Sequence, residues 1–405
     1  MVAVLLLALP SAAAARPTSA FQKGLTPGAL RVLQRVQRLN EKEKYRDSLA
    51  EIEKYRKERQ GKVPALVDFV AGNLNFQLDR YQPAAACYRR VIAAEPEFDE
   101  AYENLGAALL MLKRYKEAVK VLLEAASRRP EKAEKLRYQA ALGALYGEDY
   151  KLARKLLADL VAKKTRPPAD WLKALVQAEL ELKEKKAAAR TAARLVDLYP
   201  EKEAHWRLYA QILLAAGKYR QALSAWKVLE ANGQLKTEEY KQLAGIYQQL
   251  GLPGEAAAAF KSWLERSGKD GRKELETLVS LYRQAGEFDR ALAVLDRLEK
   301  KFPADDGLHF LRGEILYQAG RWQKARQAFA RVRKLSDEKR DGRQYLLAGY
   351  CAWNENDFKA AARAWQKAAT YPHLRRRAAG LLQSLKPWLE EAGKEEVSKE
   401  KQSAG

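Results

Sequence analysis

The chain has 405 residues, of which 47% are apolar and 31% charged, so it has enough apolar side chains to bury a core. Its two cysteines and three histidines exclude a disulfide framework and provide no set of ligands with the spacing of a metal site. Lys and Arg outnumber Asp and Glu by 74 to 52, and the net charge of +22 favours acidic partners, a membrane surface or nucleic acid.

Residues 1–15, MVAVLLLALPSAAAA, have the features of an exported leader. An apolar run is followed by small residues, and Ala13 to Ala15 fit an A-x-A cleavage site. The run is shorter than the roughly 20 apolar residues that span a bilayer, and it lacks the usual basic n-region. We expect a signal peptide over 1–15, a linker over 16–28 and a periplasmic mature protein. The alternative is an apolar leader that stays attached.

A motif of an aromatic residue followed three positions later by alanine recurs along the chain. Successive alanines are 34 to 36 residues apart if Pro253/Ala256 is included and one step of 69 is taken as two repeats. A small residue stands twelve positions before most of these alanines, at Gly72, Gly106, Ala141, Ala210, Ala244, Gly313 and Gly349. A period of this length predicts a repeated helical hairpin. The pairs are Tyr81/Ala84, Tyr115/Ala118, Tyr150/Ala153, Tyr219/Ala222, Phe288/Ala291, Trp322/Ala325 and Phe358/Ala361.

Within a repeat the apolar residues have helical spacing, as in Tyr102, Leu105 and Leu109. Glycines such as Gly217 and Gly251 stand between the two helices, where a positive φ is expected. One hairpin cannot bury its own apolar face, so neighbouring hairpins must stack. We therefore predict an all-α solenoid of about ten hairpins over 29–375. A capping helix within 376–392, broken at Pro387, and a disordered tail over 393–405 follow.

This pattern resembles the tetratricopeptide repeat. The resemblance implies a right-handed superhelix in which the first helix of each repeat lines a concave groove. The residues that match the repeat most completely are Trp206, Ala210, Leu213, Gly217, Tyr219, Ala222 and Trp226.

The groove positions implied by the repeat form three zones. The N-terminal zone is apolar, the middle zone is basic and the C-terminal zone is aromatic. Aromatic residues and Arg are the types that anchor protein interfaces, so we expect the aromatic zone to bind a partner. The N-terminal zone contains Leu66, Phe69, Asn73, Phe76, Glu103, Leu110 and Met111, the middle zone contains Arg207, Lys241, Lys273 and Arg283 with Glu238 and Glu276, and the C-terminal zone contains Phe310, Tyr317, Arg343, Tyr350 and Trp353.

One recognised variant of this groove, the carboxylate clamp, holds a terminal carboxylate with two Asn and three basic residues. Asn73 and Asn104 match the two Asn in position and spacing. Phe69 replaces the first basic residue, and Lys135 is a candidate for the second. The match is partial. The alternative to a carboxylate clamp is that Asn at these positions belongs to the general repeat pattern.

The sequence contains no Gly-rich phosphate loop, nucleophile elbow or HExxH motif. The histidines fall in different repeats. Cys87 and Cys351 lie about eight repeats apart, so we expect no disulfide bond between them and interpret both as packed small apolar groups. We predict that the protein is not an enzyme and uses no metal or cofactor.

Four stretches resemble the exported repeat proteins associated with TonB–ExbB–ExbD energy-transduction systems. The resemblance implies a periplasmic scaffold whose partners are TonB, ExbB or ExbD components, and the basic charge is compatible with peripheral membrane association. The stretches are LTPGALRVLQRVQRL (25–39), LYPEKEAHWRLYAQI (198–212), NGQLKTEEYKQLAGIYQQLGLPGEAA (232–257) and YPHLRRRAAGLLQSL (371–385).

Two other functions stay open. One is an envelope adaptor for assembly or for a cell-wall or lipopolysaccharide polymer. The other is a cytoplasmic regulatory repeat protein whose leader is not a signal. The mixture of acidic with basic residues disfavours nucleic acid as a partner.

Overall fold

The structure is a computed structural model that describes residues 25–403, with side chains for residues 25–390. The expected signal peptide over 1–15 and most of the expected linker lie outside the described residues. Within the described part the chain has 21 α-helices, one short 3₁₀ helix and no strand, which confirms the all-α prediction. None of the described helices has the length and apolar character needed to cross a membrane.

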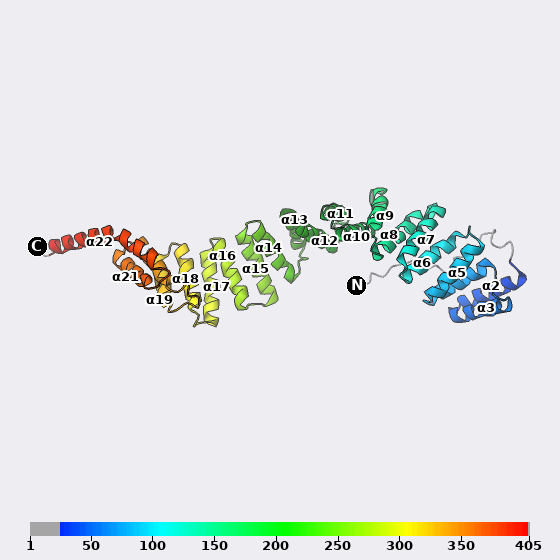
Figure 1. The fold of residues 1–405 in the computed structure, drawn as a ribbon, viewed down its shortest axis with the longest axis horizontal. Helices are drawn as coiled ribbons and strands as arrows, with labels where there is room; N and C mark the ends of the chain where they lie inside the picture. Colours follow the sequence, from blue (N-terminus) through cyan, green and yellow to red (C-terminus); the bar gives the residue numbers. More distant parts are fainter. Residues whose placement is uncertain (1–24, 404–405) are drawn as a thin grey trace. The chain divides into compact units, whose positions relative to one another are not determined.

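The chain divides into two compact units, one up to Gly217 and one from Lys218 (Figure 1). In each unit the helices form antiparallel hairpins that stack in chain order, so the repeats build a solenoid. The first unit contains α2 (Pro27–Asn40), α3 (Tyr45–Glu58), α4 (Ala65–Gln77), α5 (Tyr81–Ala94), α6 (Asp99–Met111), α7 (Tyr115–Arg128), η1 (Pro130–Lys132), α8 (Ala133–Tyr146), α9 (Tyr150–Ala162), α10 (Ala169–Glu181), α11 (Lys185–Leu198) and α12 (Glu203–Ala215).

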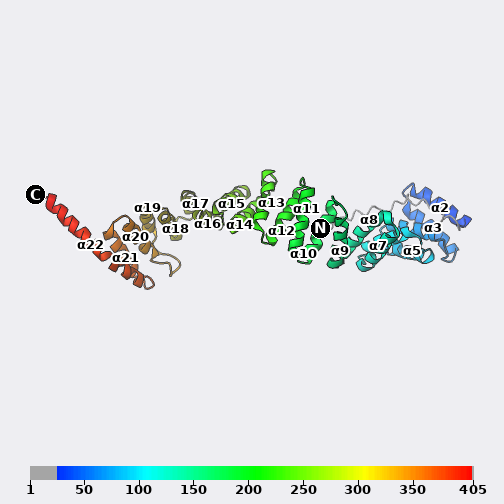
Figure 2. The ribbon, with the colours of Figure 1, turned by 90° about the horizontal axis from the view of Figure 1, so that it is seen from above.

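The second unit begins with α13 and ends with the long helix α22, which is visible in both ribbon views (Figures 1 and 2). The predicted repeat made of α12 and α13 therefore has one helix in each unit, and the other nine predicted repeats are helix pairs within one unit. The helices are α13 (Tyr219–Ala231), α14 (Thr237–Gln249), α15 (Pro253–Ser267), α16 (Arg272–Gln284), α17 (Phe288–Lys301), α18 (Asp306–Gln318), α19 (Trp322–Arg331), α20 (Arg343–Asn354), α21 (Phe358–Ala369) and α22 (Arg375–Ser403).

A left-handed residue stands in the turn between the two helices of every predicted repeat. Glycine occupies this place in only four of the ten turns, at the positions expected from the sequence. In the others a non-glycine residue adopts the same conformation, such as Lys113 at φ 58° and Lys183 at φ 60°. The ten residues are Glu43, Asp79, Lys113, Glu148, Lys183, Gly217, Gly251, Gly286, Gly320 and Asn356, and they repeat every 34 to 36 residues.

In several hairpins a small residue on the first helix faces a large residue on the second helix. A Cβ atom placed on Gly106 would lie 2.5 Å from the Leu122 side chain, and one on Gly72 would lie 2.6 Å from the Tyr88 ring. Gly313 faces the Phe329 ring and Gly349 faces the Trp365 ring in the same way. In all four pairs the large residue comes 16 positions after the glycine, so this contact is part of the repeat.

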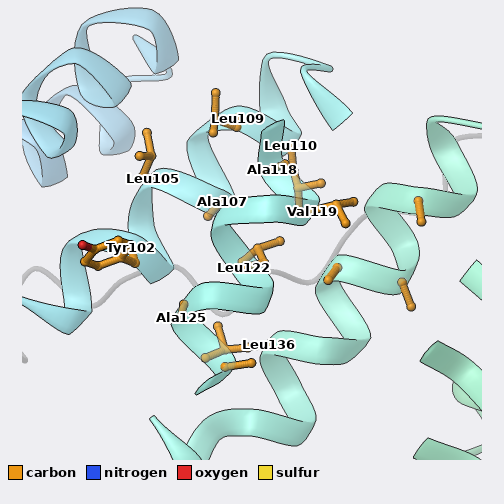
Figure 3. Close-up of a cluster of buried hydrophobic side chains, with 14 of the residues drawn as sticks. Tyr102, Leu105, Ala107, Leu109, Leu110, Ala118, Val119, Leu122, Ala125 and Leu136 are labelled. Carbon is orange, nitrogen blue, oxygen red and sulfur yellow. The ribbon is translucent and has the colours of Figure 1, made fainter. Parts of the chain in front are cut away.

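The core continues from one hairpin to the next. Leu105 and Leu109 of α6, Leu122 of α7 and Leu136 of α8 belong to one cluster of buried side chains (Figure 3). Leu122 and Leu136 are fully buried. The second helix of one repeat thus packs against the first helix of the following repeat, which buries the face that a single hairpin leaves open.

Helix α22 differs from the sequence-based expectation. It runs from Arg375 to Ser403 with Pro387 inside it, so the predicted break at Pro387 is wrong, and the helix continues through the segment expected to be a disordered tail. Its first half packs on α20 and α21 through Ala378 and Leu385, both fully buried. Proline removes one backbone donor, but the Leu, Glu, Ala and Lys residues around it are strong helix formers.

We predict that Gly106→Ala lowers the free energy of unfolding by about 1–2 kcal/mol, because the added methyl group overlaps buried Leu122. The matched control is Gly245→Ala on α14, where an added Cβ meets no atom within 4 Å. Since alanine favours a helix interior over glycine, the control should be more stable than the parent by about 0.5–1 kcal/mol. Urea unfolding followed by circular dichroism measures both midpoints. Equal shifts in the same direction would contradict the packing role of Gly106.

We also predict that Lys183→Gly stabilises the repeat formed by α10 and α11. The left-handed conformation costs a side-chain-bearing residue about 1 kcal/mol, which exceeds the entropy that glycine loses on folding. A gain of about 0.5 kcal/mol in the same unfolding measurement is expected. Lys185→Gly, at the first position of α11, serves as the control and should destabilise the chain.

Candidate partner-binding surface

The aromatic zone predicted from the sequence lies at the end of the second unit. Tyr317 is on α18, Tyr350 and Trp353 are on α20, and all three are half-buried. Helix α22 adds Arg377 and Trp388 to the same place. We call these five residues the terminal surface. It is built by helices α18, α20 and α22, which follow one another at the period of the repeat.

Trp353 is the centre of an aromatic cluster on this surface. Its ring centroid lies 5.5 Å from that of Phe358 and 5.9 Å from that of Trp388, and both pairs meet edge to face. Phe358 and Trp388 are 5.6 Å apart. The Trp388 side chain is 46% exposed, so the cluster presents an ordered aromatic edge to solvent. Trp388 of α22 thus packs against the last repeat.

Tyr350 connects the aromatic cluster to a cation. Its ring meets Trp365 edge to face at 5.6 Å, and its hydroxyl accepts a hydrogen bond from Nη2 of Arg377 at 3.3 Å. Burial raises the pKa of Tyr317, and the nearby Arg377 guanidinium acts in the opposite direction. The three side chains are therefore neighbours, and they combine apolar area with hydrogen-bond donors and positive charge.

The positive charge of the second unit is concentrated at this end. Residues 321–390 contain 16 Lys and Arg against 6 Asp and Glu, whereas residues 238–320 contain 12 against 14. Arg363, Arg375, Arg376 and Lys386 are all exposed, and among the described side chains no carboxylate forms an ion pair with them. A field of one sign next to exposed aromatic rings favours a partner that is both acidic and apolar.

The other predicted residues of the second unit have different environments. Phe310 is buried against Phe329 at 5.7 Å, so the prediction that it faces a groove is wrong. The Arg343 guanidinium lies 5.9 Å from the Phe310 ring. Lys241 is exposed, with Nζ 4.3 Å from the Trp263 ring centroid. Arg283 pairs with Glu314 at 3.4 Å, while Lys273 is exposed.

The predicted N-terminal zone belongs mostly to the core of the first unit. Phe69 and Phe76 are buried, Phe69 against Phe98 at 4.7 Å and Phe76 against Tyr81 at 5.3 Å. They therefore do not line a groove, and neither do Leu66 and Leu110, which are also buried. A large side chain at these positions reaches the neighbouring helix or loop instead of solvent.

Asn73 and Asn104 are neighbours, but their side chains are hydrogen-bonded to each other. Asn73 Oδ1 accepts a hydrogen bond from Asn104 Nδ2 and another from the Tyr88 hydroxyl, each at 2.9 Å. The cations that a carboxylate clamp would need surround Glu103 instead, with Lys132 at 2.8 Å and Lys135 at 3.6 Å. This arrangement already supplies a carboxylate to the cations, which argues against the clamp.

Arg207, the first residue of the predicted middle zone, pairs with Glu203 at 3.0 Å on α12. It belongs to the first unit, whereas Lys241, Lys273 and Arg283 belong to the second.

Over residues 25–390 no group of three His, Cys, Asp or Glu side chains could hold a metal ion. Cys87 and Cys351 are buried free thiols, and burial raises the pKa of Cys351 to about 12. His205 is also buried, and its Nδ1 lies 3.2 Å from the Tyr199 carbonyl oxygen. These side chains have packing environments, in agreement with the interpretation of the sequence.

Sequence reasoning missed Arg377 and the concentration of charge around it. Arg377 stands among three consecutive arginines after the last repeat, and the sequence alone does not tell which of them faces Tyr350. The uneven charge was visible in a count by segment, but the net charge of the whole chain conceals it.

The chain is similar to known repeat proteins. The family model described as tetratricopeptide repeat matches residues 69–133, 138–203 and 277–342. No curated protein matches the sequence. The family match shows tetratricopeptide repeats over these three segments.

Solved structures with a similar fold have low sequence identity. A tetratricopeptide repeat protein from Parabacteroides merdae is 16% identical, over 62% of this chain and 98% of that chain, with a TM-score of 0.33. The C-terminal part of a repeat protein from Cytophaga hutchinsonii is 16% identical, over 60% and 98%, with a TM-score of 0.47. MamA from Desulfovibrio magneticus is 19% identical, over 44% and 98%, with a TM-score of 0.38.

We predict that Trp353 contributes more to stability than Trp388. Trp353→Ala removes the ring that contacts Phe358, Trp365 and Trp388, and should destabilise α20 to α22 by about 2 kcal/mol. Trp388→Ala should cost about 1 kcal/mol, because half of this side chain is already exposed. Amide hydrogen exchange of α20 to α22 measures both effects. A larger loss of protection in Trp388→Ala would contradict this order.

Proposed function

We propose that this chain of tetratricopeptide repeats is a non-catalytic scaffold that binds a protein partner at the terminal surface, as an accessory component of a TonB-type transport system in the cell envelope. Tetratricopeptide repeats generally mediate contacts between proteins, and no enzymatic family matches the chain. The observation that carries the proposal is the exposed aromatic edge at Trp388 within the most basic part of the second unit.

Several physical features support binding at this surface. Trp353 and Trp388 are held by aromatic contacts, so a partner would lose little side-chain entropy in packing on them. Arg377 is held close to Tyr350 and can donate further hydrogen bonds to a carboxylate. The unpaired cations around them would attract an acidic segment and increase its rate of association.

The envelope role is supported by the sequence. The stretches at 25–39, 198–212, 232–257 and 371–385 resemble the exported repeat proteins of TonB–ExbB–ExbD systems. The leader over 1–15 is compatible with export to the periplasm. The partners would then be TonB, ExbB or ExbD components, with an acidic and apolar segment that contacts the terminal surface.

The experiment compares three versions of the full chain as bait for a detergent-solubilised envelope extract. Wild type should recover TonB, ExbB or ExbD. Arg375→Glu/Arg376→Glu should recover several-fold less, because it reverses two exposed charges that form no ion pair with a described carboxylate. Lys116→Glu/Lys300→Glu also reverses two exposed charges, but on α7 and α17, which do not build this surface, and should behave as wild type. The difference should diminish at high salt, which screens exposed charges.

The possible outcomes test separate parts of the proposal. If wild type recovers none of the three components at either salt concentration, the transport role is wrong. If it recovers them and both double variants do so equally well, the partner binds elsewhere on the chain. Retention of an envelope polymer in place of these proteins would favour the adaptor function.

A further inference from the structure

The second helices of the last two repeats, α19 and α21, contain no acidic residue. Together they have six Lys and Arg and no Asp or Glu. The second helix of the preceding repeat, α17, has four Lys and Arg with three Asp and Glu. Helices α19 and α21 lie wholly within the described residues. Their six cations are Lys324, Arg326, Arg331, Lys359, Arg363 and Lys367.

The repeat does not require cations at these positions. Lys324 and Arg331 are the third and tenth residues of α19. The third and tenth residues of α7, counted in the same way from its first aromatic residue, are Glu117 and Glu124. All four side chains are exposed, so the sign of their charge has no role in the packing of the helices. The positive charge of α19 is therefore available for binding.

Helices α19 and α21 belong to one layer of the second unit. Both pack on α20, and Arg326 of α19 reaches the turn before α21. Its Nη1 lies 2.7 Å from the Glu355 carboxylate and 3.2 Å from that of Asp357, so the acidic residues before α21 are already paired. Equivalent positions in successive repeats face the same side of a solenoid, so the exposed cations of the two helices share one face.

Four of the six cations are exposed, and no carboxylate among the described side chains forms an ion pair with them. Asp289 on α17 is influenced by Lys324, but Arg321 already binds its two oxygens at 2.6 and 2.9 Å. Nζ of Lys367 lies 4.4 Å from the Tyr345 ring centroid, a contact that leaves its charge in place. The four cations, which we call the basic face, are Lys324, Arg331, Arg363 and Lys367.

The side chains between these cations favour phosphate groups at a flat surface. Gln323, Gln327 and Gln366 are exposed beside them, and their amides donate hydrogen bonds to oxygen acceptors. None of the large hydrophobic side chains that are exposed in the described chain is on α19 or α21. The face therefore has no exposed ring on which single-stranded bases could stack and no apolar anchor for a protein partner. A cluster of Lys and Arg without such anchors is typical of segments that bind anionic lipid head groups.

We propose that the basic face docks on a membrane surface that contains anionic phospholipids, with its four cations at the level of the lipid phosphates. Each Lys or Arg close to such a surface strengthens binding about fivefold. The attachment is reversible and weakened by salt, since no apolar side chain inserts between the lipids. The proposal does not rest on the transport role, because the terminal surface is built by other helices, α18, α20 and α22.

The test measures co-sedimentation of the full chain with vesicles of phosphatidylcholine and phosphatidylglycerol, and with vesicles of phosphatidylcholine alone. Wild type should bind only the anionic vesicles, and high salt should release it. Because the whole chain has a net charge of +22, this binding alone does not locate the face.

Two double variants locate it. Lys324→Glu/Arg331→Glu removes two cations of the basic face and should weaken binding to the anionic vesicles at least about twentyfold. Lys116→Glu/Lys120→Glu changes the net charge by the same amount at two exposed residues of α7 and is the matched control. The control should bind within about threefold of wild type. Thermal unfolding followed by circular dichroism confirms that each variant is folded.

A fluorescent label tests the contact directly. Cys87 and Cys351 are buried, so thiol-reactive bimane labels the introduced side chain of Ala330→Cys. Ala330 is exposed on α19 beside the basic face. Its label should emit at shorter wavelength with anionic vesicles, because the lipid interface is less polar than water. The label of Ser127→Cys, at an exposed position of α7, should keep its wavelength.

Four results would overturn the proposal. These are equal binding of wild type to both kinds of vesicle, equal loss of binding in the two double variants, and an unchanged wavelength of the Ala330→Cys label on bound chain. The fourth is displacement of wild type from the vesicles by double-stranded DNA at equal phosphate concentration, with weaker DNA binding by Lys324→Glu/Arg331→Glu, which would make the face a nucleic-acid site. Vesicles of pure lipid contain no protein, so none of these results decides the scaffold function.

Discussion

In the hairpins that carry it, the contact between a small residue on the first helix and a large residue 16 positions later on the second determines how closely the two helices approach. Where the small residue is glycine, as at Gly106 and Gly349, even one methyl group would overlap the opposite side chain. Repeats with alanine use the same spacing, as in Ala141 with Leu157, and both residues are fully buried. Where this contact is present, the two helices lie close together, and the open face of the hairpin packs against the next hairpin of the same unit.

The short sequence separation of this contact explains why the sequence predicts the fold well. The repeat is determined by local contacts between residues less than one period apart, and the period predicts both the hairpins and the places of their turns. The residue type in the turn is less informative. Lys113 and Lys183 adopt the left-handed conformation of Gly217 because the packed helices on both sides impose it. For a similar reason Pro387 does not end α22, since favourable neighbours and packing of its first half outweigh one lost hydrogen bond.

The binding residues were harder to predict. Position in a repeat tells which face of the helix a residue lies on, but its exposure depends on the size of its neighbours in the adjacent repeat. Phe69 is buried because Phe98, in the loop before α6, lies against it, and Phe310 is buried beneath Arg343 and beside Phe329. Trp353 stays half-exposed because only α22 follows its repeat. The sequence therefore predicted the aromatic residues of this zone, but it did not predict that Phe310 is buried. It also did not predict Arg377, whose direction is fixed by the docking of α22.

A solenoid allows such sites to arise at little cost to the rest of the chain. Each repeat contacts only its neighbours, so a substitution affects the stability of one or two interfaces instead of a common core. Two exposed alanines at equivalent positions, Ala258 and Ala293, line an open hollow beside Tyr282, while Leu278 and Val294 stay buried. At the terminal surface the same freedom lets cations accumulate, because Arg363, Arg375, Arg376 and Lys386 are exposed and have no role in the packing of the helices. The contact 16 residues apart keeps the hairpins uniform, and the positions outside it are free to differ from repeat to repeat.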